Sequence, residues 1–310
     1  MTEPQATPSA LIDALAQTIV GQRDVLEALV YALIADGHVL LEGPPGLAKT
    51  LACRALASAV TGSFKRVQFT PDLLPSDIVG TRIFDQRSGD FATALGPIFA
   101  NIVLADEINR APAKVQSALL EGMQERQVTI GPQTHRLPDP FVVMATMNPI
   151  DAEGTYALPL AQMDRFLMKV LVGYPTPDEE LSILDRFGGE PRDLATGVAT
   201  LADVVAWRHA ARAVHLEPKI ARYIVALVDA TRAPHQYVER GASPRATLAL
   251  AGLARARAFV DGRDYVAPDD VKALAPAVFR HRLAFGYRTV TDNVDPETIV
   301  GDIVAGVGAP

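Results

Sequence analysis

Short apolar runs alternate with amphipathic runs in the first half of the chain, whereas amphipathic runs alone fill the second half. Apolar runs of strand length lie at residues 39–41, 67–69, 102–105, 141–146 and 167–172. A run with helical character, residues 51–60, follows the first of them. Buried strands that alternate with helices are typical of an α/β fold with a parallel sheet.

The pattern changes near Tyr174 and Pro177, where the strand-like runs end. Amphipathic helices are expected beyond this point at residues 178–187, 201–213, 220–232, 244–260 and 268–274. The last stretch, residues 290–310, is weakly patterned and predicts a short helix with a loose tail. We therefore expect two domains, an α/β core over residues 1–175 and a helical domain over residues 176–310.

A glycine- and proline-rich octapeptide connects the first strand to the first helix of this core. It consists of Gly43, Pro44, Pro45, Gly46, Leu47, Ala48, Lys49 and Thr50, and the helical run begins at Leu51. Such a loop can turn backbone N–H groups and a helix N-terminus toward a phosphate, while Lys49 supplies charge and Thr50 a hydroxyl for Mg²⁺. Ala48 stands where the strict motif has glycine, so an ordinary turn with a surface lysine is the alternative.

Two further strands end in residues that suit phosphate chemistry. Residues 102–105 lead into Asp106 and Glu107, the arrangement of a Walker-B pair, in which Asp106 holds Mg²⁺ through water and Glu107 deprotonates the attacking water. Residues 141–147 lead into Asn148, whose amide can hold a water without adding negative charge. Each feature alone is also compatible with a solvated strand end or a turn, but their order after the loop favours a nucleotide site.

Two arginines complete the candidate site. Arg165 precedes the last predicted strand, and Arg245 follows a Ser243-Pro244 pair that predicts a helix N-cap and first turn. Phosphoryl transfer needs positive charge near the γ-phosphate, supplied by the same chain or by a neighbour. The alternative for either residue is a solvated surface arginine.

The segments that carry these residues resemble the MoxR-type AAA+ ATPases, in the order of that family. They are residues 43–50, 106–112, 116–125, 147–149, 158–166 and 243–245. The resemblance implies a P-loop NTPase core with a C-terminal helical lid. It also implies that Val20 and Gly21 line the adenine pocket and that Asn148 is sensor one. Arg165 is then an arginine finger that reaches into the neighbouring subunit, and Arg245 is sensor two on the lid.

The same resemblance implies the activity and its partners. Members bind ATP and Mg²⁺, hydrolyse ATP, and act as ring-shaped chaperones, here expected to be hexameric. The protein substrate expected for them is one with a von Willebrand factor A domain. Two alternating segments, residues 82–92 and 127–137, are predicted to form hairpins, and hairpins at these places face the central pore in this branch of the AAA+ proteins.

Composition narrows the class of protein further. The single cysteine, Cys53, excludes an intramolecular disulfide framework and is expected in the core. No apolar run is long enough to span a bilayer, and residues 1–8 have no basic or hydrophobic signal region, so we expect a cytoplasmic protein without a transmembrane segment. The net charge of −7 argues against a protein built mainly to hold nucleic acid.

Two alternative functions remain open at the level of the sequence. One is a nucleic-acid-stimulated AAA+ motor, in which Arg110, Lys114, Arg126 and Arg136 form a local basic ring. The other is a scaffold switch that binds ATP with little turnover. The complete set of Asp106, Glu107, Asn148, Arg165 and Arg245 argues against the switch.

Overall fold

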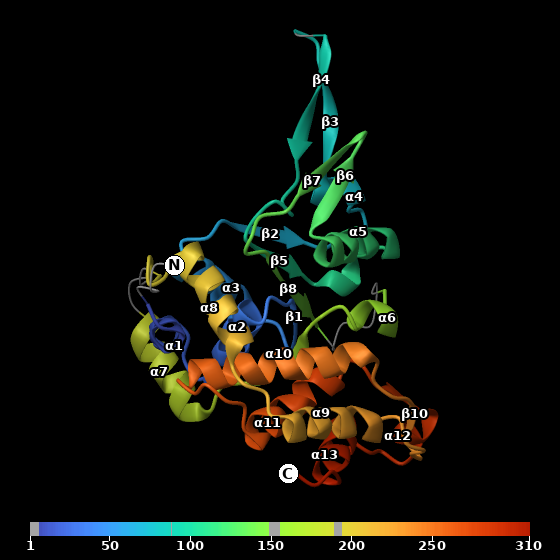
Figure 1. The fold of residues 1–310 in the computed structure, drawn as a ribbon. Helices are drawn as coiled ribbons and strands as arrows, with labels where there is room; N and C mark the ends of the chain where they lie inside the picture. Colours follow the sequence, from blue (N-terminus) through green and yellow to red (C-terminus); the bar gives the residue numbers. More distant parts are fainter. Residues whose placement is uncertain (1–5, 88, 149–155, 189–193) are drawn as a thin grey trace.

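A five-stranded sheet lies at the centre of the protein, as the computed structural model shows for residues 6–87, 89–148, 156–188 and 194–310 (Figure 1). All its strands are parallel, in the order β2-β5-β8-β1-β9. Their bounds are β1 Val39–Glu42, β2 Phe64–Gln68, β5 Ile102–Asp106, β8 Val142–Met147 and β9 Met168–Leu171. The five predicted strands and the α/β fold class are therefore confirmed.

Strand β2 begins earlier than its apolar run suggested. It lies at the edge of the sheet, where Lys65 and Arg66 are exposed, and only Val67 is buried. An edge strand tolerates charged side chains because one of its sides is open to solvent. The sequence pattern therefore revealed only the buried end of this strand.

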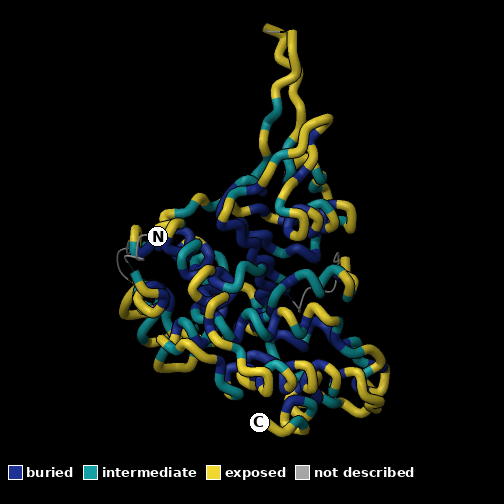
Figure 2. The backbone as a smooth tube through the Cα atoms, in the orientation of Figure 1, coloured by how far each residue is buried: buried dark blue, intermediate teal, exposed yellow. Residues whose placement is uncertain are grey.

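Both faces of the sheet are covered, so successive strand residues enter different apolar clusters. In β5, Ile102 and Leu104 pack with helices α1 (Pro8–Thr18), α2 (Arg23–Ile34) and α3 (Lys49–Ala59). Val103 and Ala105 pack instead with α4 (Pro75–Val79) and α5 (Ala113–Glu125). Helices on both faces explain the nearly continuous apolar strands of the sequence, and Figure 2 shows the sheet as the buried centre.

Cys53 lies on α3 and is fully buried, as expected for a core residue. Burial raises the pKa of its thiol far above the ordinary value. A buried thiol that stays protonated is a poor nucleophile, so Cys53 contributes packing and not chemistry.

The second half of the chain is almost entirely helical. Its helices are α7 Pro177–Phe187, α8 Leu201–Ala213, α9 Pro218–Ala230, α10 Pro244–Val260, α11 Pro268–Phe279, α12 Tyr287–Thr291 and α13 Pro296–Ala305. The apolar faces of α8, α9, α10, α11 and α13 share one continuous cluster with α1, α2 and α3. The division at residue 175 stays a prediction, because this core crosses it.

Side-chain caps explain where several of these helices begin. Thr176 and Thr200 form capping boxes with Glu179 and Asp203, and Ser243 accepts a hydrogen bond from the Arg245 N–H as predicted for an N-cap. The C-terminal helix α13 is better packed than its weak pattern suggested. Its residues Ile299, Val300 and Val304 are buried, and α13 lies against α11.

Two hairpins project from the α/β half, and both were predicted. Strands β3 (Gly80–Asp85) and β4 (Asp90–Leu95) form the longer one, and β6 (Gln127–Ile130) with β7 (Gln133–Arg136) forms the shorter one. The β3–β4 hairpin extends far from the body and is exposed along most of its length (Figures 1 and 2). Ser88 of the predicted turn lies outside the described residues.

Short elements fill the connections: η1 Ile108–Arg110, α6 Leu160–Met163, and the paired strands β10 Val238–Arg240 and β11 Ala284–Phe285. No helix among the described residues combines the length and apolar character needed to cross a membrane. Pro149, part of the motif after β8, falls outside the described residues.

His38 joins three elements just before β1. The Val143 N–H donates to its Nδ1 at 3.0 Å, so Nε2 must carry the proton and donates to the Met123 carbonyl at 3.1 Å. The neutral ring therefore connects β1, β8 and α5. Burial, assisted by the nearby Arg126, lowers the pKa of His38 from 6.5 to about 3.

We expect this histidine to make the protein less stable as the solution is acidified. In the unfolded chain His38 takes up a proton near pH 6.5, but the folded protein resists protonation down to about pH 3. Its stabilising contribution is thus complete above pH 6.5 and declines below it, by up to ~1.4 kcal/mol per pH unit.

The measurement is urea unfolding of the wild type and His38→Gln over this pH interval. Glutamine keeps a donor and an acceptor but does not titrate. The stability advantage of the wild type should shrink on acidification, and an advantage independent of pH would contradict the prediction. His281, also buried with a lowered pKa, titrates in both proteins and cancels in the comparison.

Candidate functional site

The carboxyl ends of the strands meet around one cavity of about 420 Å³. The loop after β1 and the first residues of α3 form one wall, and the residues at the ends of β5 and β8 form the other. The lining residues are Pro45, Gly46, Leu47, Ala48, Lys49, Thr50, Leu51, Arg66, Gln68, Asp106, Glu107, Thr146, Met147 and Asn148. The structure thus brings together the loop, the acidic pair and Asn148, all at the edge where parallel α/β sheets bind ligands.

The loop conformation explains its small residues. A Cβ on Gly43 would lie 2.3 Å from the Val172 carbonyl oxygen, and Gly46 has a φ of +83°. Ala48 has φ 53° and ψ 16°, the small left-handed region that residues other than glycine occupy at some cost. Ala48 therefore holds a backbone conformation that glycine adopts without this cost, at the position where the strict motif has glycine.

Lys49 lies at the start of α3 and donates to the carbonyl oxygens of Gly43 and Pro44. Burial lowers the pKa of its ammonium group, while Asp106 and Glu107 act in the opposite direction. A partly desolvated cation beside a helix N-terminus is well suited to phosphate oxygens. Thr50, the next residue, lines the same cavity.

Asp106 is held on both carboxylate oxygens. Arg66 donates to Oδ2 from Nε at 3.0 Å and from Nη2 at 2.6 Å, and the Thr146 hydroxyl donates to Oδ1 at 2.6 Å. The carboxylate is therefore oriented by neighbours on both sides, β2 and β8.

Glu107 has a φ of 57°, an uncommon conformation that turns the chain sharply at the end of β5. Its N–H donates to the Thr146 hydroxyl at 2.8 Å, and its Oε2 accepts from Gln68 at 2.9 Å and from Arg110 at 3.1 Å. Thr146 thus contacts both acids, accepting from one and donating to the other.

Sequence reasoning missed Arg66, Gln68 and Thr146. The available signal was that Arg66 and Gln68 alternate on one face of a strand, and that Thr146 interrupts an apolar run. Only the strand order places β2 and β8 on either side of β5, and this order is what gives these three residues contact with the acidic pair.

The side-chain oxygens in this cavity are suitable ligands for a magnesium ion that binds together with a nucleotide. Mg²⁺ is commonly held by one or two protein oxygens, with phosphates and waters as the other ligands. Thr50 and Asp106 provide such oxygens in one cavity. Among the described residues no cluster of three or more His, Cys, Asp or Glu side chains could hold a metal by itself.

Val20 and Gly21 line a second cavity, of about 570 Å³, at the same edge of the sheet. Leu171, Gly173 and Tyr174, at and after the end of β9, form part of its wall. Gln22 Nε2 donates to the Leu47 carbonyl at 3.3 Å, which ties this segment to the phosphate-binding loop. The position beside the loop is compatible with the expected adenine pocket.

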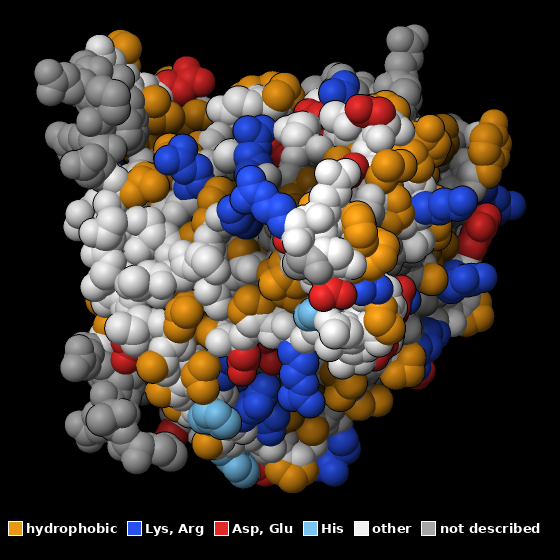
Figure 3. Space-filling view, turned by 90° about the horizontal axis from the view of Figure 1, so that it is seen from above, with side chains coloured by type: hydrophobic (Ala, Val, Ile, Leu, Met, Phe, Trp, Pro, Cys, Tyr) orange, Lys and Arg blue, Asp and Glu red, His pale blue; other side chains and the backbone are white. Residues whose placement is uncertain are grey.

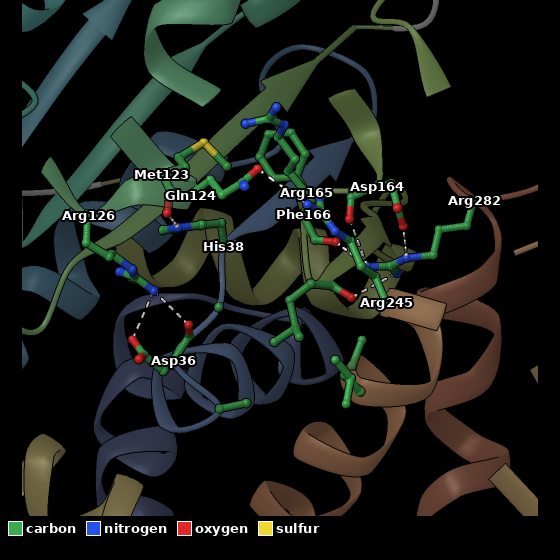
Figure 4. A pocket seen from close by; sticks show the side chains of 15 residues that line it. Asp36, His38, Met123, Gln124, Arg126, Asp164, Arg165, Phe166, Arg245 and Arg282 are labelled. Atoms are coloured by element: carbon green, nitrogen blue, oxygen red, sulfur yellow. Dashed lines mark hydrogen bonds and ion pairs between the residues drawn. The ribbon is translucent and has the colours of Figure 1, made fainter. Parts of the chain in front are cut away.

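Arg165 and Arg245 lie elsewhere, around a cavity of about 360 Å³ (Figure 4). This cavity is also lined by His38, which precedes β1, and Leu167, which precedes β9. It is therefore at the amino edge of the sheet, separated from the phosphate-binding loop by the length of β1, about 13 Å. The structure brings the two arginines together, but not into the cavity lined by Lys49, Asp106 and Asn148 of their own chain.

Both arginines contact α5. Arg165 Nη1 donates to the Leu120 carbonyl at 3.0 Å, and Arg245 Nη2 lies 3.4 Å from Gln124 Oε1. Helix α5 begins shortly after Glu107. It therefore runs from the edge of the sheet that carries Glu107 to the edge that carries the two arginines.

Comparisons with known proteins agree with this architecture. Residues 38–168 match the ATPase family associated with various cellular activities (AAA), and residues 230–303 match the AAA lid domain. The chain is 49% identical to the chaperone MoxR1 of Mycobacterium tuberculosis over 94% of this chain and 79% of that protein. It is 33% identical to the protein MoxR of Methylorubrum extorquens, over 87% and 85% of the two chains.

Two further relatives cover nearly the whole length. The YeaC protein of Bacillus subtilis is 44% identical over 96% of this chain and 93% of its own. The crystal structure of a protein from Cytophaga hutchinsonii is 42% identical, with a TM-score of 0.90 over 97% of this chain and 94% of that one.

Because the Thr146 hydroxyl contacts both acids, we expect its removal to reduce ATP turnover. Thr146→Val keeps the side-chain shape but releases Asp106 Oδ1 and the Glu107 N–H, so ATP turnover should fall by about 10- to 100-fold with a smaller change in ATP affinity. Steady-state kinetics and equilibrium nucleotide binding measure the two effects. Thr146→Ser retains the hydroxyl as the control, and full turnover in the valine variant would contradict the role.

Proposed function

The chain belongs to the MoxR family of AAA+ ATPases, and from this premise we propose that it works as a ring that remodels or activates a partner protein. Within the ring, residues of two subunits together form each nucleotide site. One observation carries the proposal: the phosphate-binding loop and the acidic pair lie at one edge of the sheet, and Arg165 and Arg245 lie at the other. A single chain therefore holds two incomplete halves of a site.

The first half contains the groups that bind and activate. The loop N–H groups and Lys49 bind phosphates, and Thr50 and Asp106 hold Mg²⁺. Glu107 orients a water and takes its proton, and Asn148 holds that water through its amide. When bound, Mg²⁺ neutralises charge on the phosphate oxygens. These roles are those expected from the sequence.

The second half supplies positive charge to the nucleotide of the adjacent subunit. Arg165 takes the role of arginine finger, and Arg245, expected as sensor two, lies beside it at the same cavity. We propose that both act on the neighbour, since the length of the sheet separates them from their own nucleotide cavity. Head-to-tail contacts between identical chains form a ring when the rotation between neighbours closes, and a hexamer is the size we expect.

The partner we propose is a protein with a von Willebrand factor A domain. The β3–β4 hairpin offers a surface for it, because Ile83, Phe84 and Phe91 are half-exposed and the two phenylalanine rings pack edge to face with centroids 5.2 Å apart. Arg82 lies over the Phe91 ring. Seen from the hairpin end, hydrophobic and basic side chains intermingle (Figure 3), a composition that suits protein contacts.

The two alternatives receive less support. Of the four residues considered for a basic ring, Arg110 is paired with Glu107 and Arg126 with Asp36. A nucleic-acid motor would need these charges for phosphates. A switch with little turnover would not need Glu107 held in place by Gln68, Arg110 and Thr146.

Mixing subunits tests the shared site. Glu107→Gln should bind ATP without cleaving it, and Arg165→Ala should bind ATP normally but lose turnover by about 10³-fold or more. Mixed rings of the two variants should regain turnover, since an intact Glu107 then meets an intact Arg165 from the neighbour. Light scattering with ATP and Mg²⁺ is used to check that each variant and each mixture assembles. Mixtures as inactive as their components would contradict an arginine supplied by the neighbour.

The exposed phenylalanines of the β3–β4 hairpin lead to a prediction about how a partner protein changes ATP turnover. Adding a protein with a von Willebrand factor A domain should change the steady-state ATPase rate, and the Phe84→Ser/Phe91→Ser variant should lose this response while keeping its basal rate. Val290→Ser, at an exposed apolar position on α12, is the control. Stimulation by duplex DNA instead, with a steep dependence on salt, would favour the nucleic-acid motor.

A further inference from the structure

A buried ion pair connects the helical half to the loop that carries Arg165. Arg282, which follows α11, donates from Nε to Asp164 Oδ1 at 2.8 Å. It also donates to the carbonyls of Phe166 and Leu167, at 2.6 and 3.1 Å. The Arg282 side chain is only 2% exposed and that of Asp164 17%. One guanidinium therefore holds the segment on both sides of Arg165.

The second oxygen of Asp164 is attached to α10. The Ser243 hydroxyl donates to Asp164 Oδ2 at 2.8 Å and accepts from the Arg245 N–H at 3.1 Å. Ser243 is the N-cap of α10, so this contact also fixes where the helix begins. Asp164 is thus linked through one hydroxyl to the backbone of Arg245.

These contacts place Asp164 between the two functional arginines. Arg165 follows it directly in the chain, and Arg245 is reached through Ser243. Figure 4 shows Asp164, Arg165, Arg245 and Arg282 around the same hollow. Among the described residues, the side chains of Arg165 and Arg245 both donate to α5, at the Leu120 carbonyl and at Gln124 Oε1.

Stability alone is a weak explanation for such a pair. Desolvation of a buried ion pair offsets much of its attraction, and apolar residues of similar size are often equally stabilising. What the pair does provide is a defined geometry, because a carboxylate with charged and hydroxyl donors on separate oxygens has little freedom to rotate.

We propose that Asp164 is a positioning residue that sets the spacing of Arg165 and Arg245, so that both approach the same nucleotide of the neighbouring subunit. Because Ser243 and Arg282 belong to the helical half, movement of that half carries both arginines together. This inference rests on the proposed action of the arginines on the neighbouring subunit.

Two substitutions weaken the contacts of Asp164 to different degrees. Asp164→Asn keeps the shape but removes the charge, and Ser243→Ala removes only the hydroxyl link. We expect turnover to fall by about 10- to 100-fold in the first and less in the second, with ATP affinity unchanged, since small misplacements of catalytic groups reduce the rate strongly. Ser243→Thr restores the hydroxyl and should restore turnover.

The matched control is Asp295→Ala. Asp295 caps α13 by accepting from the Glu297 N–H, as Ser243 does for Arg245, but it lies on another helix. Its loss should lower thermal stability and leave turnover intact. Turnover lost equally in Asp295→Ala and Ser243→Ala would overturn the positioning role.

Mixed rings distinguish failure of this inference from failure of the proposed function. Asp164→Asn retains its own nucleotide cavity, so mixing it with Glu107→Gln, whose arginines are intact, should restore turnover. The mixture of Arg165→Ala with Glu107→Gln is the benchmark. If the benchmark recovers and the Asp164→Asn mixture does not, the positioning role is wrong and the shared site stands.

If neither mixture recovers, the shared site fails and the inference falls with it. Should Asp164→Asn not fold, Ser243→Ala takes its place in the same mixture, with the same two outcomes. Circular dichroism and thermal unfolding show whether each variant is folded, and only folded variants are compared.

Discussion

The common direction of the five strands is the constraint on which the site depends. Parallel strands place all their carboxyl ends at one edge and all their amino ends at the other. The loop after β1, the acids at the end of β5 and the asparagine after β8 therefore converge without being near one another in sequence. The segments that precede β1 and β9 converge in the same way at the opposite edge, and one of them carries Arg165.

Helix α5 connects these two edges within one subunit. Its first turn follows Glu107 through η1, and the Gln116 side chain holds that connection by donating to the Ile108 and Ala111 carbonyls. Its last turns contact Arg165, Arg245 and His38. In the proposed ring, a helix that links Glu107 to the two arginines gives a direct physical route between adjacent nucleotide sites.

The carboxylates at the two edges of the sheet differ in how firmly their partners are held. Asp106 and Glu107 are paired with side chains that can exchange those contacts for a metal ion or a water, because Arg66, Gln68 and Arg110 are partly exposed. Asp164 is paired with Arg282, which is buried and also bonded to backbone carbonyls. The first arrangement allows ligand binding, and the second maintains a fixed geometry.

The sequence by itself determined the fold class, the five strands, most helices, both hairpins and the glycine- and proline-rich turn between β1 and α3. Each of these follows from local periodicity or from residues adjacent in the chain, such as Lys49 and Thr50. Departures occurred where packing replaced local pattern: β2 extends over exposed charges at an edge, and α13 is ordered by its contact with α11.

Only the tertiary structure decided which residues meet. Arg66, Gln68 and Thr146 act on the acidic pair because β2 and β8 flank β5, and strand order leaves no local signal. Likewise, Arg165 and Arg245 were both identified from the chain, but their separation from the nucleotide cavity depends on the direction of the strands. The link from Arg282 through Asp164 to Ser243 joins three distant segments, and its geometry exists only after the helical half has packed against the sheet.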